Sequence, residues 1–172
     1  MVDFSRSSAV PFGRTFVSSD AFRAMFREGM LLVEETAAYL DGGGREESRL
    51  LPRDVALAYA TESMRLTTRL MQIASWLLVQ RAVAEGEITS DQARTEKNRV
   101  KITDMSAATE PQIEAMLPER LRELMDASLR MQARVRHLEN LVIAESDIAA
   151  FPPQGANDVV SQIDRLRAAF AR

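Results

Sequence analysis

The architecture of this chain follows from one long segment, residues 52–85, with the sequence PRDVALAYATESMRLTTRLMQIASWLLVQRAVAE. Pro52 is typical of the first turn of a helix and Gly86 of its end, so the segment predicts a single helix about 50 Å long. Its apolar side chains cover roughly 200° of the circumference, more than one neighbouring helix can bury. One edge of this arc consists of Val55, Tyr59, Leu66, Leu70, Ile73 and Leu77, and the other of Leu57, Met64, Met71, Ala74 and Leu78. We expect this helix to be the spine of the fold, packed between at least two partners.

Two further segments predict long helices that pack on the spine. The first begins at an N-cap at Ser18 or Ser19 and ends at Gly42–Gly44, where glycine supplies the C-cap. The last begins near Pro118 and runs to about Ala144. Its apolar positions alternate by four and three, which predicts a heptad seam: Leu117, Leu121, Leu124, Ser128, Met131, Val135, Leu138 and Val142.

A short accessory helix is predicted over residues 90–101, because Thr89 and Gln92 have the spacing of a capping box. No segment alternates apolar and polar residues as a strand does. The sequence therefore predicts an all-α, up-down-up three-helix bundle with a long central helix and flexible termini. The expected organisation is a flexible N-terminal arm, the bundle, and a C-terminal tail with a short amphipathic helix, over residues 1–18, 19–145 and 146–172.

Composition excludes several classes of protein. The 172 residues contain no cysteine, which removes disulfide scaffolds, thiolate zinc sites and iron–sulfur clusters. The net charge of −3 gives no overall attraction for nucleic acid. The sequence shows neither a leader segment nor an apolar run of about 20 residues that could cross a bilayer. We therefore expect a cytoplasmic protein.

Catalytic constellations are also missing from the sequence. The single histidine, His137, lies opposite the heptad seam and is expected on the surface. Gly42–Gly44 follows a helix, whereas a phosphate-binding loop follows a strand. The carboxylate pairs Glu34–Glu35 and Glu46–Glu47 are adjacent in sequence and do not face a common cleft. We expect no enzymatic activity, no metal and no cofactor.

Nucleic-acid binding stays open as an alternative function. Arg94, Lys97, Arg99 and Lys101 form a basic patch within residues 94–101. Arginines also occur along the last helix, but carboxylates alternate with them and no aromatic stacking platform accompanies them. The alternative is a nucleic-acid-binding regulatory protein that uses this patch.

The spine also carries a polar row with a tryptophan in it. A tryptophan beside arginines is typical of an interface hot spot, and the row consists of Glu62, Arg65, Arg69, Gln72, Trp76 and Gln80. The row is either a surface for another protein or is covered by the N-terminal arm or the accessory helix. As a surface, it predicts that Trp76→Ala weakens association with little effect on folding. Methionines at helical spacings, by contrast, predict core packing: Met25, Met30, Met64, Met71, Met125 and Met131.

Three stretches carry a resemblance to a known family: FRAMFREGM at residues 22–30, VEETAAYLDG at 33–42 and LAYATESMRLTTRLMQIASWLLVQRA at 57–82. Together they resemble the RcdA family, regulators of CtrA degradation in alphaproteobacteria. The resemblance covers about residues 15–145, and the spine is its most specific part.

The resemblance implies a non-enzymatic adaptor that helps the ClpXP protease receive substrates such as the cell-cycle regulator CtrA. The implied partners are ClpXP, a response regulator of the CpdR type, a cyclic-di-GMP effector and substrate proteins. Homodimerisation, recruitment to the cell pole and a contribution from the C-terminal tail are further implications. The tail of this chain departs from the family at Phe151-Pro152-Pro153, which puts tail-dependent delivery in doubt.

Overall fold

A computed structural model of the chain describes residues 16, 19–89, 92–93, 95–96 and 109–150, with the side chains of 143–150 left out. Three long helices make up most of this part: α2 (Asp20–Asp41), α4 (Arg53–Ala84) and α7 (Glu119–Ala150). Two short helices, α3 (Gly43–Arg49) and α6 (Pro111–Glu114), precede α4 and α7. The described residues include no strand, and the fold is all-α as the sequence predicts.

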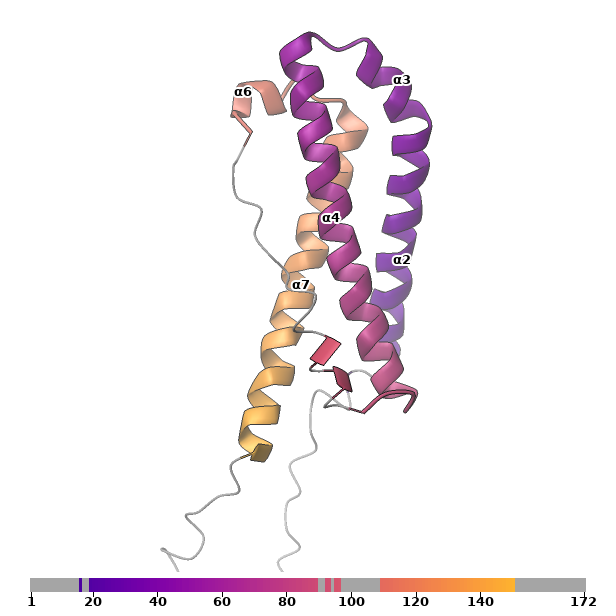
Figure 1. Ribbon diagram of the computed structural model, residues 1–172, viewed down its shortest axis with the longest axis vertical. Coiled ribbons are helices and arrows are strands. Elements are labelled where there is room, and N and C mark those ends of the chain that lie inside the picture. The colour runs from indigo at the N-terminus through magenta and orange to yellow at the C-terminus, as the bar shows by residue number, and fades with distance from the viewer. Residues whose placement is uncertain (1–15, 17–18, 90–91, 94, 97–108, 151–172) are drawn as a thin grey trace, which may run out of the picture.

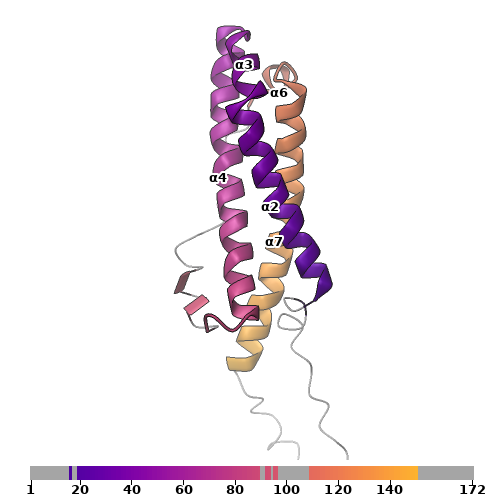
Figure 2. The ribbon, with the colours of Figure 1, turned by 90° about the vertical axis from the view of Figure 1, so that its right-hand side faces the viewer.

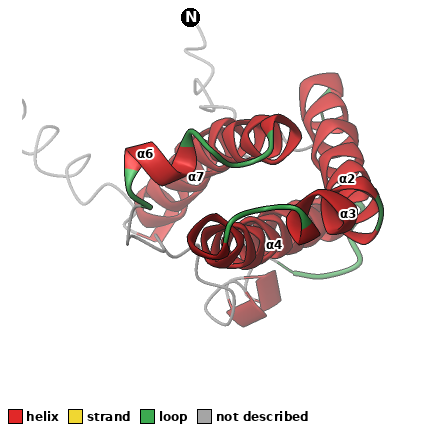
Figure 3. Cartoon of the chain, turned by 90° about the horizontal axis from the view of Figure 1, so that it is seen from above, coloured by secondary structure: helices red, strands yellow, loops and turns green. Residues whose placement is uncertain are grey.

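The three long helices form the predicted up-down-up bundle. Both α2 and α7 pack against α4, and α2 also contacts α7 (Figures 1 and 2). Viewed along the bundle, α2 and α7 lie beside α4 with α3 and α6 at one end (Figure 3). The spine therefore has two long neighbours, as the sequence predicts.

Local signals in the sequence explain where the helices begin and end. The Ser19 hydroxyl accepts a hydrogen bond from the Phe22 amide at 3.3 Å and caps α2. Pro52 is the N-cap of α4, and Gly86 follows α4 with a φ of 74°, a conformation that favours glycine. Helix α7 ends at Ala150, beyond the predicted end near Ala144.

Gly42 is the C-cap of α2, as predicted, and the rest of the glycine run has a further part. Helix α2 does end at Asp41, but Gly43 and Gly44 begin α3 and do not form a loop. Gly44 is buried, and a Cβ there would lie 2.6 Å from the Tyr59 hydroxyl. The run thus lets the chain turn from α2 into α3 close to the spine.

The heptad seam of α7 is confirmed. From Leu117 to Leu138 every predicted seam residue is buried, and Val142 is half-buried. These side chains meet a second set from the other two long helices, which includes Phe22, Met25, Leu66, Ile73 and Leu77. The core lies between the three helices along most of their length.

One prediction about the spine is wrong. The edge formed by Leu57, Met64, Met71 and Leu78 does not pack in the core: these side chains are 71%, 71%, 66% and 51% exposed. Helices α2 and α7 cover only the other part of the circumference. The methionine prediction therefore fails for Met64 and Met71, although Met25, Met125 and Met131 are buried and Met30 is half-buried.

The predictions for the N-terminal arm, the accessory helix and the C-terminal tail can be compared with the structure only in part. The predicted capping box is formed: the Thr89 amide donates a hydrogen bond to the Gln92 side chain at 2.8 Å, and the Gln92 amide donates one to the Thr89 hydroxyl at 3.2 Å. The basic patch residues Arg94, Lys97, Arg99 and Lys101 lie outside the described residues, as do residues 151–172. Of the predicted N-terminal arm, Phe16 is described, and its ring meets Phe22 edge-on.

Candidate protein-interaction surfaces

The polar row of the spine is buried inside the chain. Glu62 and Trp76 are each 5% exposed and Gln80 is 6% exposed, while Arg65, Arg69 and Gln72 are partly buried. The prediction that this row forms an open surface is therefore wrong. The predicted cover, the N-terminal arm or the accessory helix, lies largely outside the described residues. The physical reason for the burial is that α7 and Thr109 contact the side of α4 that carries the row.

An ion pair lies at one end of the polar row. Arg65 and Glu62 pair at 2.5 Å with side chains only 16% and 7% exposed, as their spacing on the helix predicts. The hydroxyl of Thr109 also donates a hydrogen bond to Glu62. The carboxylate of Glu62 thus has two partners, which offsets the cost of its removal from water.

Further along the row, α4 is bonded directly to α7. Arg69 donates to the Ser128 hydroxyl at 2.7 Å, and Ser128, which is fully buried, donates to the Met125 carbonyl at 2.7 Å. The indole N–H of Trp76 has no hydrogen-bond partner among the described residues. The row therefore joins helices of one chain, and a role for it in binding another protein stays a prediction.

The outer face of α4 presents an exposed apolar stripe, whose side chains the sequence pattern predicts to be buried. This α4 stripe consists of Leu57, Met64, Met71 and Leu78, four of the large apolar side chains that are exposed in the described part of the chain. Its members recur every seven residues, the spacing that keeps side chains on one line along a helix when it packs lengthwise on another. It extends over about 32 Å of α4.

The residues beside the α4 stripe are small, and the hydroxyls of the three threonines among them are satisfied within the helix. Ala60, Thr67 and Ala74 lie on one side of it, and Thr61, Thr68 and Ser75 on the other. The threonine hydroxyls donate to backbone carbonyls of α4: Thr61 to Leu57 at 3.0 Å, Thr67 to Ser63 at 2.8 Å and Thr68 to Met64 at 2.9 Å. The face can therefore become dry without leaving these groups unpaired.

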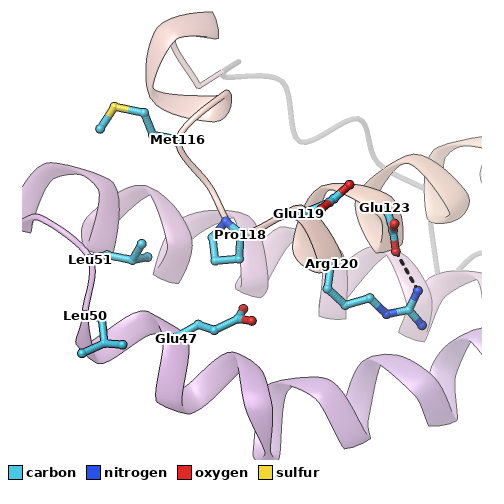
Figure 4. A pocket seen from close by; sticks show the side chains of 8 residues that line it. All are labelled: Glu47, Leu50, Leu51, Met116, Pro118, Glu119, Arg120 and Glu123. Atoms are coloured by element: carbon cyan, nitrogen blue, oxygen red, sulfur yellow. Dashed lines mark hydrogen bonds and ion pairs between the residues drawn. The ribbon is translucent and has the colours of Figure 1, made fainter.

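A groove of about 590 Å³ lies at the end of the bundle where α3 meets the start of α7 (Figure 4). Leu50 and Met116 are 87% and 56% exposed at this groove, which we call the end groove. Its complete lining is Glu47, Leu50, Leu51, Met116, Pro118, Glu119, Arg120 and Glu123. Apolar side chains thus lie together with a carboxylate-rich rim.

The charges at the end groove are partly neutralised within the bundle. Arg120 pairs with Glu123 at 2.9 Å and with Glu35 of α2 at 3.0 Å. The Tyr39 hydroxyl donates to Glu47 at 2.7 Å, and burial, followed by this bond, raises the pKa of Tyr39, so that it stays a donor. Three carboxylates and one guanidinium leave the lining with a formal charge of −2.

Several other predicted positions are also described. His137 is exposed, and so are Glu34, Glu35, Glu46 and Glu47. Within the described residues, no group of three histidine, cysteine, aspartate or glutamate side chains is placed to hold a metal ion. No helix in this part of the chain is long and apolar enough to cross a membrane.

Comparisons with known proteins agree on a family. The family model described as "Protein of unknown function (DUF1465)" matches residues 13–170. The crystal structure of RcdA from Caulobacter crescentus CB15 matches with 52% sequence identity and a TM-score of 0.59, over 72% of this chain and 92% of that one. No curated protein matches the sequence. The chain is therefore a member of the DUF1465 family and belongs to the same family as RcdA.

Proposed function

We propose that this protein is a non-enzymatic adaptor that promotes regulated proteolysis by bringing proteins together. The α4 stripe carries this proposal. An exposed row of large apolar side chains along some 32 Å of helix is costly in water, and such a patch is typical of a surface that another protein covers. Because an adaptor works through surfaces, it requires no reactive groups.

The family of the chain supports the choice of process. Its similarity to RcdA favours delivery of cell-cycle regulators resembling CtrA to the ClpXP protease. The partners proposed are ClpXP, a response regulator of the CpdR type, a cyclic-di-GMP effector and the substrates themselves. On this proposal the protein acts in the cytoplasm and is recruited to the cell pole.

We further propose that a second copy of the chain covers the α4 stripe. Read in either direction, the stripe has the same order, Leu–Met–Met–Leu, with Thr67 and Thr68 at its centre. Two antiparallel copies of α4 would therefore place leucine against leucine and methionine against methionine, with the same patch used by both copies as in a two-fold interface. The small residues on both sides permit close approach of the two helices.

A reconstituted degradation assay tests the adaptor function. Turnover of a CtrA-like substrate by ClpXP and the response regulator is measured with and without this protein. We expect faster turnover with the wild-type chain and at least a fivefold weaker stimulation with Met64→Glu/Met71→Glu. Leu129→Glu is the matched control, because Leu129 is 46% exposed on α7 and lies outside the stripe. Unchanged turnover on addition of the wild-type chain would contradict the adaptor function.

A further inference from the structure

The end groove has the chemistry of a site for a short peptide. Leu50 and Met116 expose apolar surface, and Leu51 and Pro118 add to it (Figure 4). The side chain of Glu119 is exposed and makes no hydrogen bond or ion pair with any described residue. An apolar groove with a rim of charge −2 is complementary to a large apolar side chain with cationic neighbours.

The chain itself contains such a segment. Residues 160–172, VSQIDRLRAAFAR, place Leu166 between Arg165 and Arg167, and Phe170 follows one turn later in the periodicity of the segment. Three arginines and one aspartate give these residues a formal charge of +2. The sign is opposite to that of the groove, and the apolar residues recur at Val160, Ile163, Leu166 and Phe170.

We propose that the end groove is the docking site for residues 160–172 of a second copy of this chain. Leu166 enters between Leu50 and Met116, and Arg165 and Arg167 meet the carboxylates of the rim. Docking of the segment within the same chain is disfavoured by its reach. Helix α7 begins at the groove and ends at Ala150, about 47 Å away at 1.5 Å per residue. The 16 residue steps from Ala150 to Leu166 span at most about 53–58 Å, so the chain would have to be extended to more than about four-fifths of its full length.

A second copy removes this requirement, and here the inference rests on the proposed antiparallel pairing along the α4 stripe. That pairing puts the end of the partner's bundle where α7 terminates at the same end of the dimer as the end groove, because α7 ends at the opposite end of α4 from α3 and α6 (Figure 1). In such a dimer, the C-terminal segment of each copy would lie in the end groove of the other. The segment would lengthen the self-interface, and its release would open the groove to another basic, apolar peptide.

Binding of a peptide tests the groove without requiring the dimer. The probe is a fluorescent peptide of residues 157–172, titrated by anisotropy against the full chain with Arg165→Glu/Arg167→Glu, whose own segment no longer competes. We expect saturable binding that Leu50→Glu or Glu119→Lys weakens at least tenfold and that Leu129→Glu leaves unchanged. A probe with both arginines replaced by glutamate should bind at least tenfold more weakly. Absence of saturable binding, or equal binding to Leu50→Glu, would overturn the groove assignment.

Disulfide trapping tests which copy supplies the segment, since the chain has no cysteine of its own. Full-length Met116→Cys and Leu166→Cys variants are mixed and oxidised. We expect a covalent dimer of the two variants that is at least tenfold more abundant than with Leu129→Cys in place of Met116→Cys. A chain that carries both Met116→Cys and Leu166→Cys is oxidised in parallel. If only this double variant forms a bond, within one chain, the second-copy assignment is wrong. Neither experiment includes ClpXP, so failure of the adaptor function would leave both results interpretable.

Discussion

The two sides of α4 reverse the usual distribution of polar and apolar residues. On the side toward α7, a glutamate, two arginines and two glutamines lie buried or half-buried around Trp76. On the outer side, two leucines and two methionines are exposed to water. The buried polar side is bonded within the chain, whereas each side chain of the stripe on the outer side is more than half exposed. The contrast teaches that residue polarity alone does not identify the binding surface of a bundle, and that unsatisfied apolar area is the better guide.

The largest effect is expected for Trp76→Ala. Because Trp76 is buried, its truncation leaves a cavity in the bundle and should lower the free energy of unfolding by roughly 3–5 kcal/mol. Met71→Ala, on the exposed side, should change the free energy of unfolding of the monomer by less than about 0.5 kcal/mol. Urea denaturation of both variants measures the difference. Equal stability of the two would place Trp76 on the surface, as the sequence analysis allowed.

A smaller effect is expected for Glu62→Ala. Arg65 is only 16% exposed, and the substitution removes its carboxylate partner and the acceptor of the Thr109 hydroxyl. The free energy of unfolding should therefore fall by roughly 3 kcal/mol. The exposed pair of Glu46 and Arg49 at 2.9 Å is the matched control, and Glu46→Ala should cost less than about 1 kcal/mol. Thermal unfolding of both variants is the measurement. Similar melting temperatures would show that the buried pair contributes no more than a surface one.

Gly29→Ala is expected to destabilise the chain by roughly 1–3 kcal/mol, because overpacking of a core forces its neighbours to shift. Gly29 is buried, and a Cβ there would lie 2.6 Å from Cδ1 of Leu77 on the covered side of α4. Gly43→Ala is the control, since nothing lies within 4 Å of its Cβ position. Calorimetry should show a lower melting temperature for Gly29→Ala only. A fall of the same size in the melting temperature of Gly43→Ala would point to a backbone effect and not to the contact with Leu77.

Periodicity was enough to predict the three long helices, the heptad seam of α7 and the capping box at Thr89. It could not predict which edge of the wide apolar arc of α4 would be covered, because that depends on how α2 and α7 approach the spine. The signal that was overlooked is Ser128: a small polar residue within an apolar seam indicates a polar partner opposite, which is Arg69. The end groove had no signal, since residues 47–51 and 116–123 become neighbours only in the folded chain.

Sedimentation velocity tests the central claim, that the α4 stripe is a surface for another protein chain, most directly. We predict that the wild-type chain sediments as a dimer at micromolar concentration. Met64→Glu/Met71→Glu should sediment as a monomer with its free energy of unfolding, measured on the monomer, changed by less than about 1 kcal/mol. The matched Leu129→Glu variant should remain a dimer. A wild-type monomer, or a dimer that persists in Met64→Glu/Met71→Glu, would contradict pairing through this face.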